Sequence, residues 1–192
     1  DVMRPGTDFT VRYHAISSFG DEKAIEYPES MKPLSFKIVS EENSRTISVY
    51  KDAAQKQRIL RIKSEDILDT PLKYDVFGTT DNFLGRFEKK GDALSSDVWE
   101  IIDTKDRKAF VYDGASWKTA LRNIIPKGES WVPQNYDMTM GDKHIANFQQ
   151  YFNPFLIEIG IFIRSPKLSK GMKGLALAAG ILIATRADKT VL

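Results

Sequence analysis

Positive charge gathers in two places along this chain, and both could bind an anionic group. The first is an acid-free run in which lysine or arginine recurs every three residues, at Arg164, Lys167, Lys170 and Lys173. Near an anionic membrane each such residue contributes ~1 kcal/mol of binding free energy, so three or four together would matter. The simpler interpretation is a solvated connection between two structural elements. The run is therefore a candidate headgroup or phosphate site.

The second basic cluster lies in a short segment rich in β-branched residues. Side chains alternate between the two faces of a strand, so Arg61 and Lys63 share one face. Arg58 falls near the start of the segment, on the face of Leu60 and Ile62. This strand cluster is the second candidate for binding an anionic headgroup.

The sequence contains few combinations of residues that are typical of catalytic sites. His14 and His144 lie in predicted strands with no neighbouring acid or serine pattern that would set up a triad or a metal site. The chain has no cysteine, which excludes a thiol nucleophile and cysteine-ligated zinc. It also has no P-loop and no GxGxxG run for binding nucleotides. The carboxylate pairs fall in predicted turns, where solvated acids are common: Glu41-Glu42, Glu65-Asp66 and Asp103/Asp106. We expect a protein that is not an enzyme and needs no metal or cofactor.

The element next to the first cluster is a long apolar segment, residues 172–187. Leu, Ala and Met favour helix, and a helix of this length spans roughly 24 Å, short of the ~30 Å hydrocarbon core of a bilayer. It is apolar on every side except near its ends, so a soluble protein would have to surround it. We predict a helix at the core of the fold, with these residues buried: Leu175, Leu177, Gly180, Ile181 and Leu182.

Short runs of β-branched and aromatic residues could form the enclosure. Residues 155–163 give the clearest pattern, because Phe155 and the four isoleucines at alternate positions would form one apolar face, directed inward. Turn signals separate the runs in the rhythm of an antiparallel meander, without a βαβ pattern. The other predicted strands are residues 46–50, 57–63, 73–77, 97–102 and 107–112. One short amphipathic helix is predicted at 115–125, where Trp117, Ala120, Leu121 and Ile124 recur at helical spacing.

This order of elements resembles the tubby C-terminal-like superfamily, which includes tubby proteins, phospholipid scramblases and LURP-one-related proteins. The Phe-Asn-Pro-Phe turn at 152–155 resembles the LURP-one-related branch, and residues 172–183 resemble the last helix of scramblases. The resemblance covers about residues 34–187. It implies a mainly β (β+α) fold, a closed antiparallel barrel of about 12 strands wrapped around the buried C-terminal helix.

The resemblance also implies a binding function. Tubby domains use a basic surface site for phosphoinositides, although no residue of that site can be carried over to this chain. Scramblases have an acidic calcium-binding stretch before their last helix, whereas residues 164–170 contain no carboxylate here. Calcium prefers several oxygen ligands with net negative charge, so no calcium is expected at this loop.

Length and charge are consistent with one domain. The chain has 192 residues, 42% of them hydrophobic, which is enough for a core without disulfides. We predict an N-terminal strand and loop at 1–33, with the strand at 9–16 and the loop at 20–33. The tubby-like barrel domain is expected at 34–192. The formal charge of +2 does not indicate nucleic-acid binding. Because the chain begins at Asp1 without a leader, we expect that a signal peptide or N-terminal region has been removed, and we expect a cytoplasmic or peripheral membrane location.

Two functions follow from these features. The favoured one is a soluble, non-enzymatic binding module that contacts an anionic phospholipid headgroup or a protein partner. The alternative is a membrane-associated, scramblase-like protein with the terminal helix inserted in the bilayer, where Ala176 and Gly180 would form a small-xxx-small pair. The same small residues would also let the helix fit inside a narrow barrel.

Overall fold

One β-sheet and one helix make up the part of the chain that the computed structural model describes, namely residues 8–13, 31–41, 44–51, 54–64, 73–90, 98–113, 135–151, 157–165 and 167–187. The helix, α3, spans Lys170–Ala187. The strands are β1 (Asp8–Tyr13), β2 (Met31–Glu41), β3 (Ser44–Tyr50), β4 (Arg58–Ser64), β5 (Lys73–Phe77), β6 (Phe83–Lys90), β7 (Val98–Asp103), β8 (Lys108–Asp113), β9 (Asn135–Met140), β10 (Lys143–Tyr151) and β11 (Ile157–Ile163).

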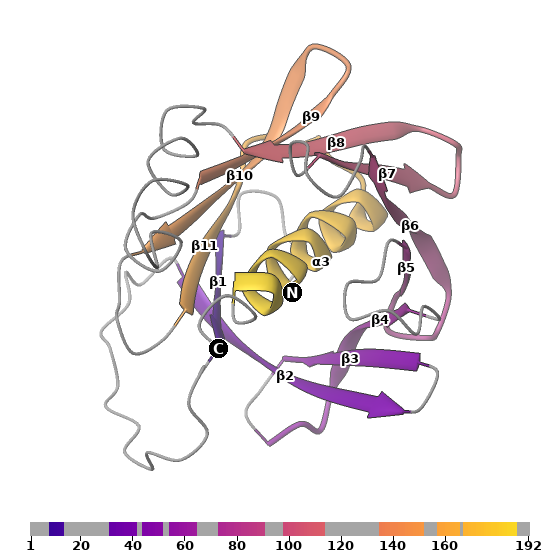
Figure 1. Ribbon diagram of the computed structural model, residues 1–192, viewed down its shortest axis with the longest axis vertical. Helices are drawn as coiled ribbons and strands as arrows, with labels where there is room; N and C mark the ends of the chain where they lie inside the picture. The colour runs from indigo at the N-terminus through magenta and orange to yellow at the C-terminus, as the bar shows by residue number, and fades with distance from the viewer. Residues whose placement is uncertain are drawn as a thin grey trace.

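The sheet is a meander that runs around α3. From β2 to β11 each strand pairs antiparallel with the next one along the chain, and β11 then pairs antiparallel with β1. β1 also pairs in parallel with the first residues of β2, so the order of pairing returns to its starting strand. Figure 1 shows the strands arranged around α3. The prediction of a mainly β fold with an antiparallel sheet and a C-terminal helix is confirmed.

α3 is the centre of the hydrophobic core. All five residues predicted to be buried in this segment are buried, and Ala176, Ala178 and Ala184 of the same helix are fully enclosed as well. The helix contacts β1, β4, β6, β7 and β11 on different sides. In the described part of the chain, no helix has both the length and the apolar character to cross a membrane.

Gly180 lets α3 approach β11 closely. Ile159, Ile161 and Ile163 of β11 are buried in the inward-facing stripe that the alternation predicts. A Cβ atom added to Gly180 would overlap the side chain of Ile161, with its Cγ1 at 2.7 Å, and would lie 3.4 Å from Cδ1 of Phe148. The absence of a side chain at this position therefore sets the distance between the helix and the sheet.

Some elements were not predicted. Phe87 is the only large hydrophobic residue fully buried in β6, and Met138 the only one in β9. β6 has no β-branched residue and β9 has only Thr139, so both lack the composition typical of strands. The predicted loop at 20–33 is wrong at its end, because β2 begins at Met31. The predicted helix at 115–125 and the turn at 152–155 lie outside the described residues.

Candidate anion-binding site

Five strand connections meet the start of α3 at one end of the sheet. Turn 78–82 joins β5 to β6, turn 104–107 joins β7 to β8, and turn 141–142 joins β9 to β10. β3 leads into β4 at the same end, where the Lys51 N–H donates to the Gln57 carbonyl at 2.9 Å. β11 also ends there, since the Arg164 N–H donates to the Ile145 carbonyl near the start of β10 at 3.0 Å. Arg58, from the strand cluster, and the run that begins at Arg164, about a hundred residues later in sequence, are thus brought to one end of the sheet.

Cations outnumber carboxylates about two to one among the described residues of these connections. We call this surface the basic end. Its cations are Lys51, Lys56, Arg58, Lys105, Arg107, Lys143, Arg164, Lys167 and Lys170, and its carboxylates are Asp81, Asp103, Asp106 and Asp142. Asp81 and Asp103 are already engaged by arginines. Lys56 is engaged in an interaction within the chain, whereas the other lysines of the basic end form no ion pair with a described residue.

The pre-helix run is only partly the solvated connection that the sequence suggests. Arg164, Lys167 and Lys170 are exposed, and none of them forms an ion pair with a described residue. The guanidinium of Arg164 lies over the ring of Phe162, 5.7 Å from its centroid. Lys173 is different, because α3 begins at Lys170 and Lys173 is already enclosed in its first turn, 3% exposed. The prediction that Lys173 belongs with the exposed lysines is wrong.

A β-bulge changes the strand cluster. Val49 lies opposite Leu60, but Tyr50 lies opposite Arg58, so Ile59 is an extra residue in β4. The side chain of Arg58 therefore falls on the same outer face as Arg61, and its predicted placement on the face of Leu60 and Ile62 is wrong. The sequence alone could not show this, since a single inserted residue reverses the alternation.

Arg58 and Arg61 share one carboxylate. Nη2 of Arg58 lies 2.7 Å from Oδ1 of Asp81, and Nη2 of Arg61 lies 3.4 Å from the same oxygen. The Arg61 guanidinium also stacks on Phe77, 4.8 Å from the ring centroid. Neither Nε atom has a hydrogen-bond partner although both are buried. Two guanidinium groups against one carboxylate leave positive charge and donors available for a second anion.

Lys63 is not part of this arrangement. It lies farther along β4, opposite Thr46 of β3 and Asp75 of β5, and it is itself engaged in an interaction within the chain. The Asp75 carboxylate on that face accepts from Arg86 at 2.6 and 3.1 Å. Arg58 therefore belongs to the basic end, Arg61 lies next to it through their shared carboxylate Asp81, and Lys63 lies outside.

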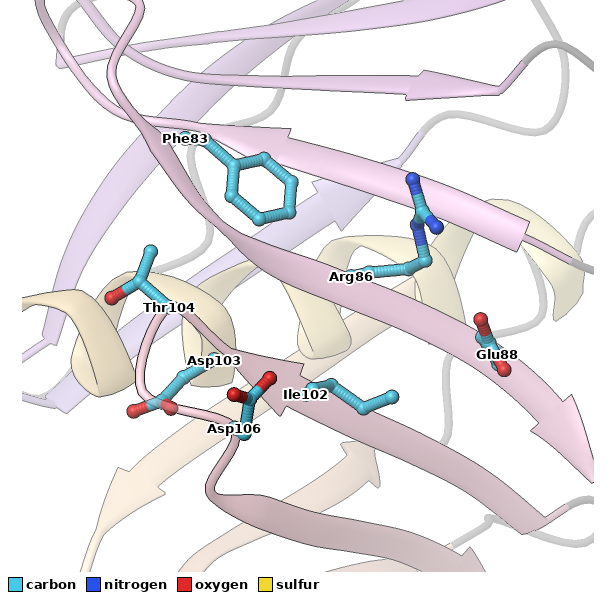
Figure 2. Close-up of a pocket in the computed structure, with 7 residues that line it drawn as sticks. All are labelled: Phe83, Arg86, Glu88, Ile102, Asp103, Thr104 and Asp106. Atoms are coloured by element: carbon cyan, nitrogen blue, oxygen red, sulfur yellow. The ribbon is translucent and has the colours of Figure 1, made fainter.

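An exposed aromatic side chain and a pocket lie beside the arginine pair. Phe83, at the start of β6, is 42% exposed and packs edge-on against Phe77 with ring centroids 5.8 Å apart. Figure 2 shows it beside a pocket of about 400 Å³ between β6, β7 and the turn that follows β7. The lining residues are Phe83, Arg86, Glu88, Ile102, Asp103, Thr104 and Asp106. Phe83 thus places apolar surface next to the cations of the basic end.

Asp103 holds the turn between β7 and β8 against α3. Its carboxylate accepts from the backbone N–H groups of Lys105 and Arg107 at 2.8 and 2.9 Å, and from Nε of Arg107 at 2.8 Å. Burial raises the pKa of Asp103, but these hydrogen bonds outweigh burial and hold its pKa below the usual range. The anchored Arg107 then reaches Ser169 at the start of α3, with Nη2 3.4 Å from Oγ.

Glu100 neutralises two other lysines on the outer face. Its carboxylate lies 2.8 Å from Nζ of Lys108 and 2.7 Å from Nζ of Lys90. The hydrogen bonds from Lys108 and then Lys90 lower the pKa of Glu100 despite its burial. The hydrogen bond to Glu100 in turn raises the pKa of Lys90. These cations stabilise the sheet and are not free to bind a ligand.

The histidine and carboxylate residues form no metal site or triad in the described residues. His144 is exposed on β10, with Nδ1 3.9 Å from Oδ1 of Asp137. Within the described ranges, no group of three or more such side chains could hold a metal ion. His14 lies outside these ranges. Sequence reasoning missed Lys51, Lys105, Arg107 and Lys143. Lys105, Arg107 and Lys143 lie in or beside predicted turns, whereas Lys51 only follows the strand predicted at 46–50.

No protein-family model, no curated protein and no solved structure matches this chain. The resemblance to the tubby-like superfamily stays a prediction.

Proposed function

We propose that this chain is a non-enzymatic, tubby-like binding module that recognises anionic phospholipid headgroups through the basic end. One observation carries the proposal: Arg58 and the run from Arg164 to Lys170 come together at a surface where cations exceed carboxylates. Each cation near an anionic membrane contributes ~1 kcal/mol, so the exposed lysines and arginines there are enough for reversible membrane binding.

The scaffold that we propose is the closed antiparallel barrel of about 12 strands found in that superfamily. Two features support it: the pairing order that returns from β11 through β1 to β2, and the enclosure of α3. The described residues contain eleven strands. Such a scaffold would hold the connections of the basic end at fixed positions.

A membrane surface suits this site better than a purely charged partner. The basic end combines exposed lysines with the exposed ring of Phe83, and a membrane interface offers anionic headgroups next to hydrocarbon. Aromatic rings are favoured at the depth of the headgroups. A protein partner with an acidic surface would use the lysines but would not require the apolar ring.

The test is sedimentation with vesicles of phosphatidylcholine that contain phosphatidylserine or phosphatidylinositol 4-phosphate. The variant Lys167→Gln/Lys170→Gln should bind these vesicles about thirtyfold more weakly than the wild type, because it loses ~2 kcal/mol of attraction. The matched control is Lys73→Gln/Lys89→Gln, which removes the same charge from β5 and β6 toward the opposite end. It should bind like the wild type.

A second variant in the same experiment should bind anionic vesicles more tightly than the wild type. Asp81→Asn removes the carboxylate that Arg58 and Arg61 share, so binding to anionic vesicles should increase. Asp81 is about half exposed, so the change should cost no more than ~1 kcal/mol of stability. Equal sedimentation of the wild type and both basic-end variants would refute the proposal and point to a protein partner.

A further inference from the structure

Arg58 and Arg61 use their guanidinium groups less fully than another arginine of the same sheet. In a guanidinium group, Nε–H and one N–H of Nη2 lie along the same edge, which can hold an anion through two parallel hydrogen bonds. Arg86 uses this edge fully, since its Nε and Nη2 donate to the two oxygens of Asp75 at 2.6 and 3.1 Å. Arg58 and Arg61 instead meet Asp81 through Nη2, and their Nε atoms have no hydrogen-bond partner.

Asp81 is a poor counter-charge for this pair of arginines. Both Nη2 atoms contact the same oxygen, Oδ1, and one negative charge faces two positive ones. The two Nε–H donors are buried without a partner, which is costly for a polar group. The two side chains as a whole are 32% and 31% exposed, so the pair lies at the surface. These unused donors suit an anion with more oxygens and more charge than one carboxylate.

The turn that carries Asp81 is closed by its own backbone. The Gly78 N–H donates to the Asn82 carbonyl at 2.8 Å, and the Asp81 N–H donates to the Gly78 carbonyl at 3.1 Å. Asp81 has a left-handed backbone, with φ at 57°, which aspartate and asparagine adopt more readily than most residues. Since its carboxylate is about half exposed, it can leave the arginines for water while the turn stays folded.

We propose that Arg58 and Arg61 bind a phosphate monoester and that Asp81 is an internal counter-charge which the ligand displaces. A monoester carries up to two negative charges and three terminal oxygens, so it matches two guanidinium charges and can use the Nε–Nη2 edge of both. A phosphate diester has a single charge, as Asp81 does, so its exchange for the carboxylate would gain little. Release of Asp81 lets both side chains turn their Nε–H groups toward the ligand. This inference rests on the proposed function in that it assigns the headgroup phosphate to one place at the edge of the basic end.

The first experiment titrates the whole chain with inorganic phosphate, which stands for the monoester group, and follows the arginine Nε–H resonances by NMR. Phosphate should shift the signals of Arg58 and Arg61. The signal of Arg86, whose Nε is already bound to Asp75, should not move. Dimethyl phosphate, a diester, should shift the first two signals much less at the same concentration. If phosphate leaves both signals unmoved, the proposal is overturned.

Calorimetry of two variants separates the paired donors from charge alone. Arg58→Lys/Arg61→Lys keeps both charges but lacks the guanidinium edges, so it should bind phosphate about tenfold or more weakly than the wild type. The matched control is Arg86→Lys, which makes the same kind of change on β6 and should alter phosphate affinity less than about twofold. Equal phosphate affinity in the wild type and the double lysine variant would refute binding by the arginine pair.

Removal of the internal counter-charge tests its displacement. Asp81→Asn keeps the backbone conformation of the turn but no longer competes for the arginines, so it should bind phosphate about tenfold more tightly. The control is Asp142→Asn, which removes the same charge from an exposed turn of the basic end where Asp142 forms no ion pair with a described residue. If both variants gain equally, Asp81 acts only through general charge and its displacement is refuted.

Vesicles separate the two sources of the phosphate and the two proposals. A lipid source predicts that Arg58→Lys/Arg61→Lys loses its preference for vesicles containing phosphatidylinositol 4-phosphate over those containing phosphatidylserine, which has only a diester. A soluble source predicts binding of inorganic phosphate with no such vesicle preference. If no anionic vesicle binds but phosphate still shifts the two Nε–H signals, the membrane function fails and the arginine site stands. If vesicles bind but phosphate moves neither signal, the arginine site fails and the membrane function stands.

Discussion

Gly171 and Gly180 are two glycines of α3 in opposite surroundings. Gly180→Leu would force a side chain into Ile161 and Phe148, so it should lower the free energy of unfolding by ~1–3 kcal/mol or more. Gly171→Ala meets open space and should raise it by up to ~1 kcal/mol, as expected from helix propensity. Urea denaturation measures both. A Gly180→Leu protein as stable as the wild type would mean that α3 does not lie against β11.

Asp103 and Glu100 make stability depend on pH. Both carboxyls have a pKa that is lowered in the folded protein, so the unfolded chain binds more protons as the pH falls. Their contribution is complete above the unfolded values of about 3.9 and 4.3, and it is lost as the pH falls through the lowered folded values. Urea midpoints should therefore decrease steeply below about pH 4.

Asp103→Asn isolates one of these two groups. The variant keeps an oxygen for the backbone N–H groups but loses the charge opposite Arg107, so it should be ~1 kcal/mol less stable at neutral pH. Its stability should also fall less steeply than that of the wild type in acid, because one titrating group is gone. An unchanged acid slope would show that Asp103 does not link protonation to folding.

Two charged residues show what a sequence pattern cannot reveal. Arg58 was placed on the wrong face because the bulge at Ile59 reverses the alternation, and bulges leave no reliable trace in residue types. Lys173 was placed in solvent because a lysine is seldom buried. Arg164, Lys167 and Lys170 are exposed as their types suggest. That these residues lie at the same end of the sheet as Arg58 depends on the register of the strands. The register is set by many residue pairs that are far apart in sequence, so no local pattern predicts it.

At the scale of elements, α3 was predictable and parts of the sheet were not. The helix is a continuous apolar segment, and β11 has strict alternation, so each carries its own signal. β6 and β9 take their conformation from the strands on either side. A polar strand with one buried anchor is indistinguishable by sequence from a turn-rich loop.

The dependence of the whole fold on α3 is testable at Leu177. Leu177 is fully buried, so Leu177→Asp would place an unpaired charge in the core and cost several kcal/mol, against a typical total of ~5–15. We expect no cooperative unfolding transition in this variant by circular dichroism. Lys170→Asp is the control in the same helix, since it puts an exposed acid at the first turn and should leave the fold intact. A soluble Leu177→Asp protein with an unchanged melting temperature would place this side chain outside the core.

The charge of the whole molecule conceals the arrangement of its charges. A formal net charge of +2 on 192 residues does not suggest an anionic partner. Among the described residues, the connections at the end where α3 begins carry more cations than carboxylates, while Lys90 and Lys108 on the outer face are neutralised by Glu100. The field of the basic end acts on an anionic surface over a Debye length of ~8–10 Å.

Washing the bound protein with salt distinguishes the two ways in which the whole molecule could hold a membrane. If the basic end holds it, about 1 M salt should release it from anionic vesicles, because the Debye length then shortens to ~3 Å. If α3 left the sheet and inserted, the protein would resist salt and need detergent, since burial of an apolar helix does not depend on ionic strength. α3 is enclosed on several sides in the structure, so its departure would expose the core stripe of β11 to water. We therefore expect release by salt, and retention through the wash would favour the scramblase-like alternative.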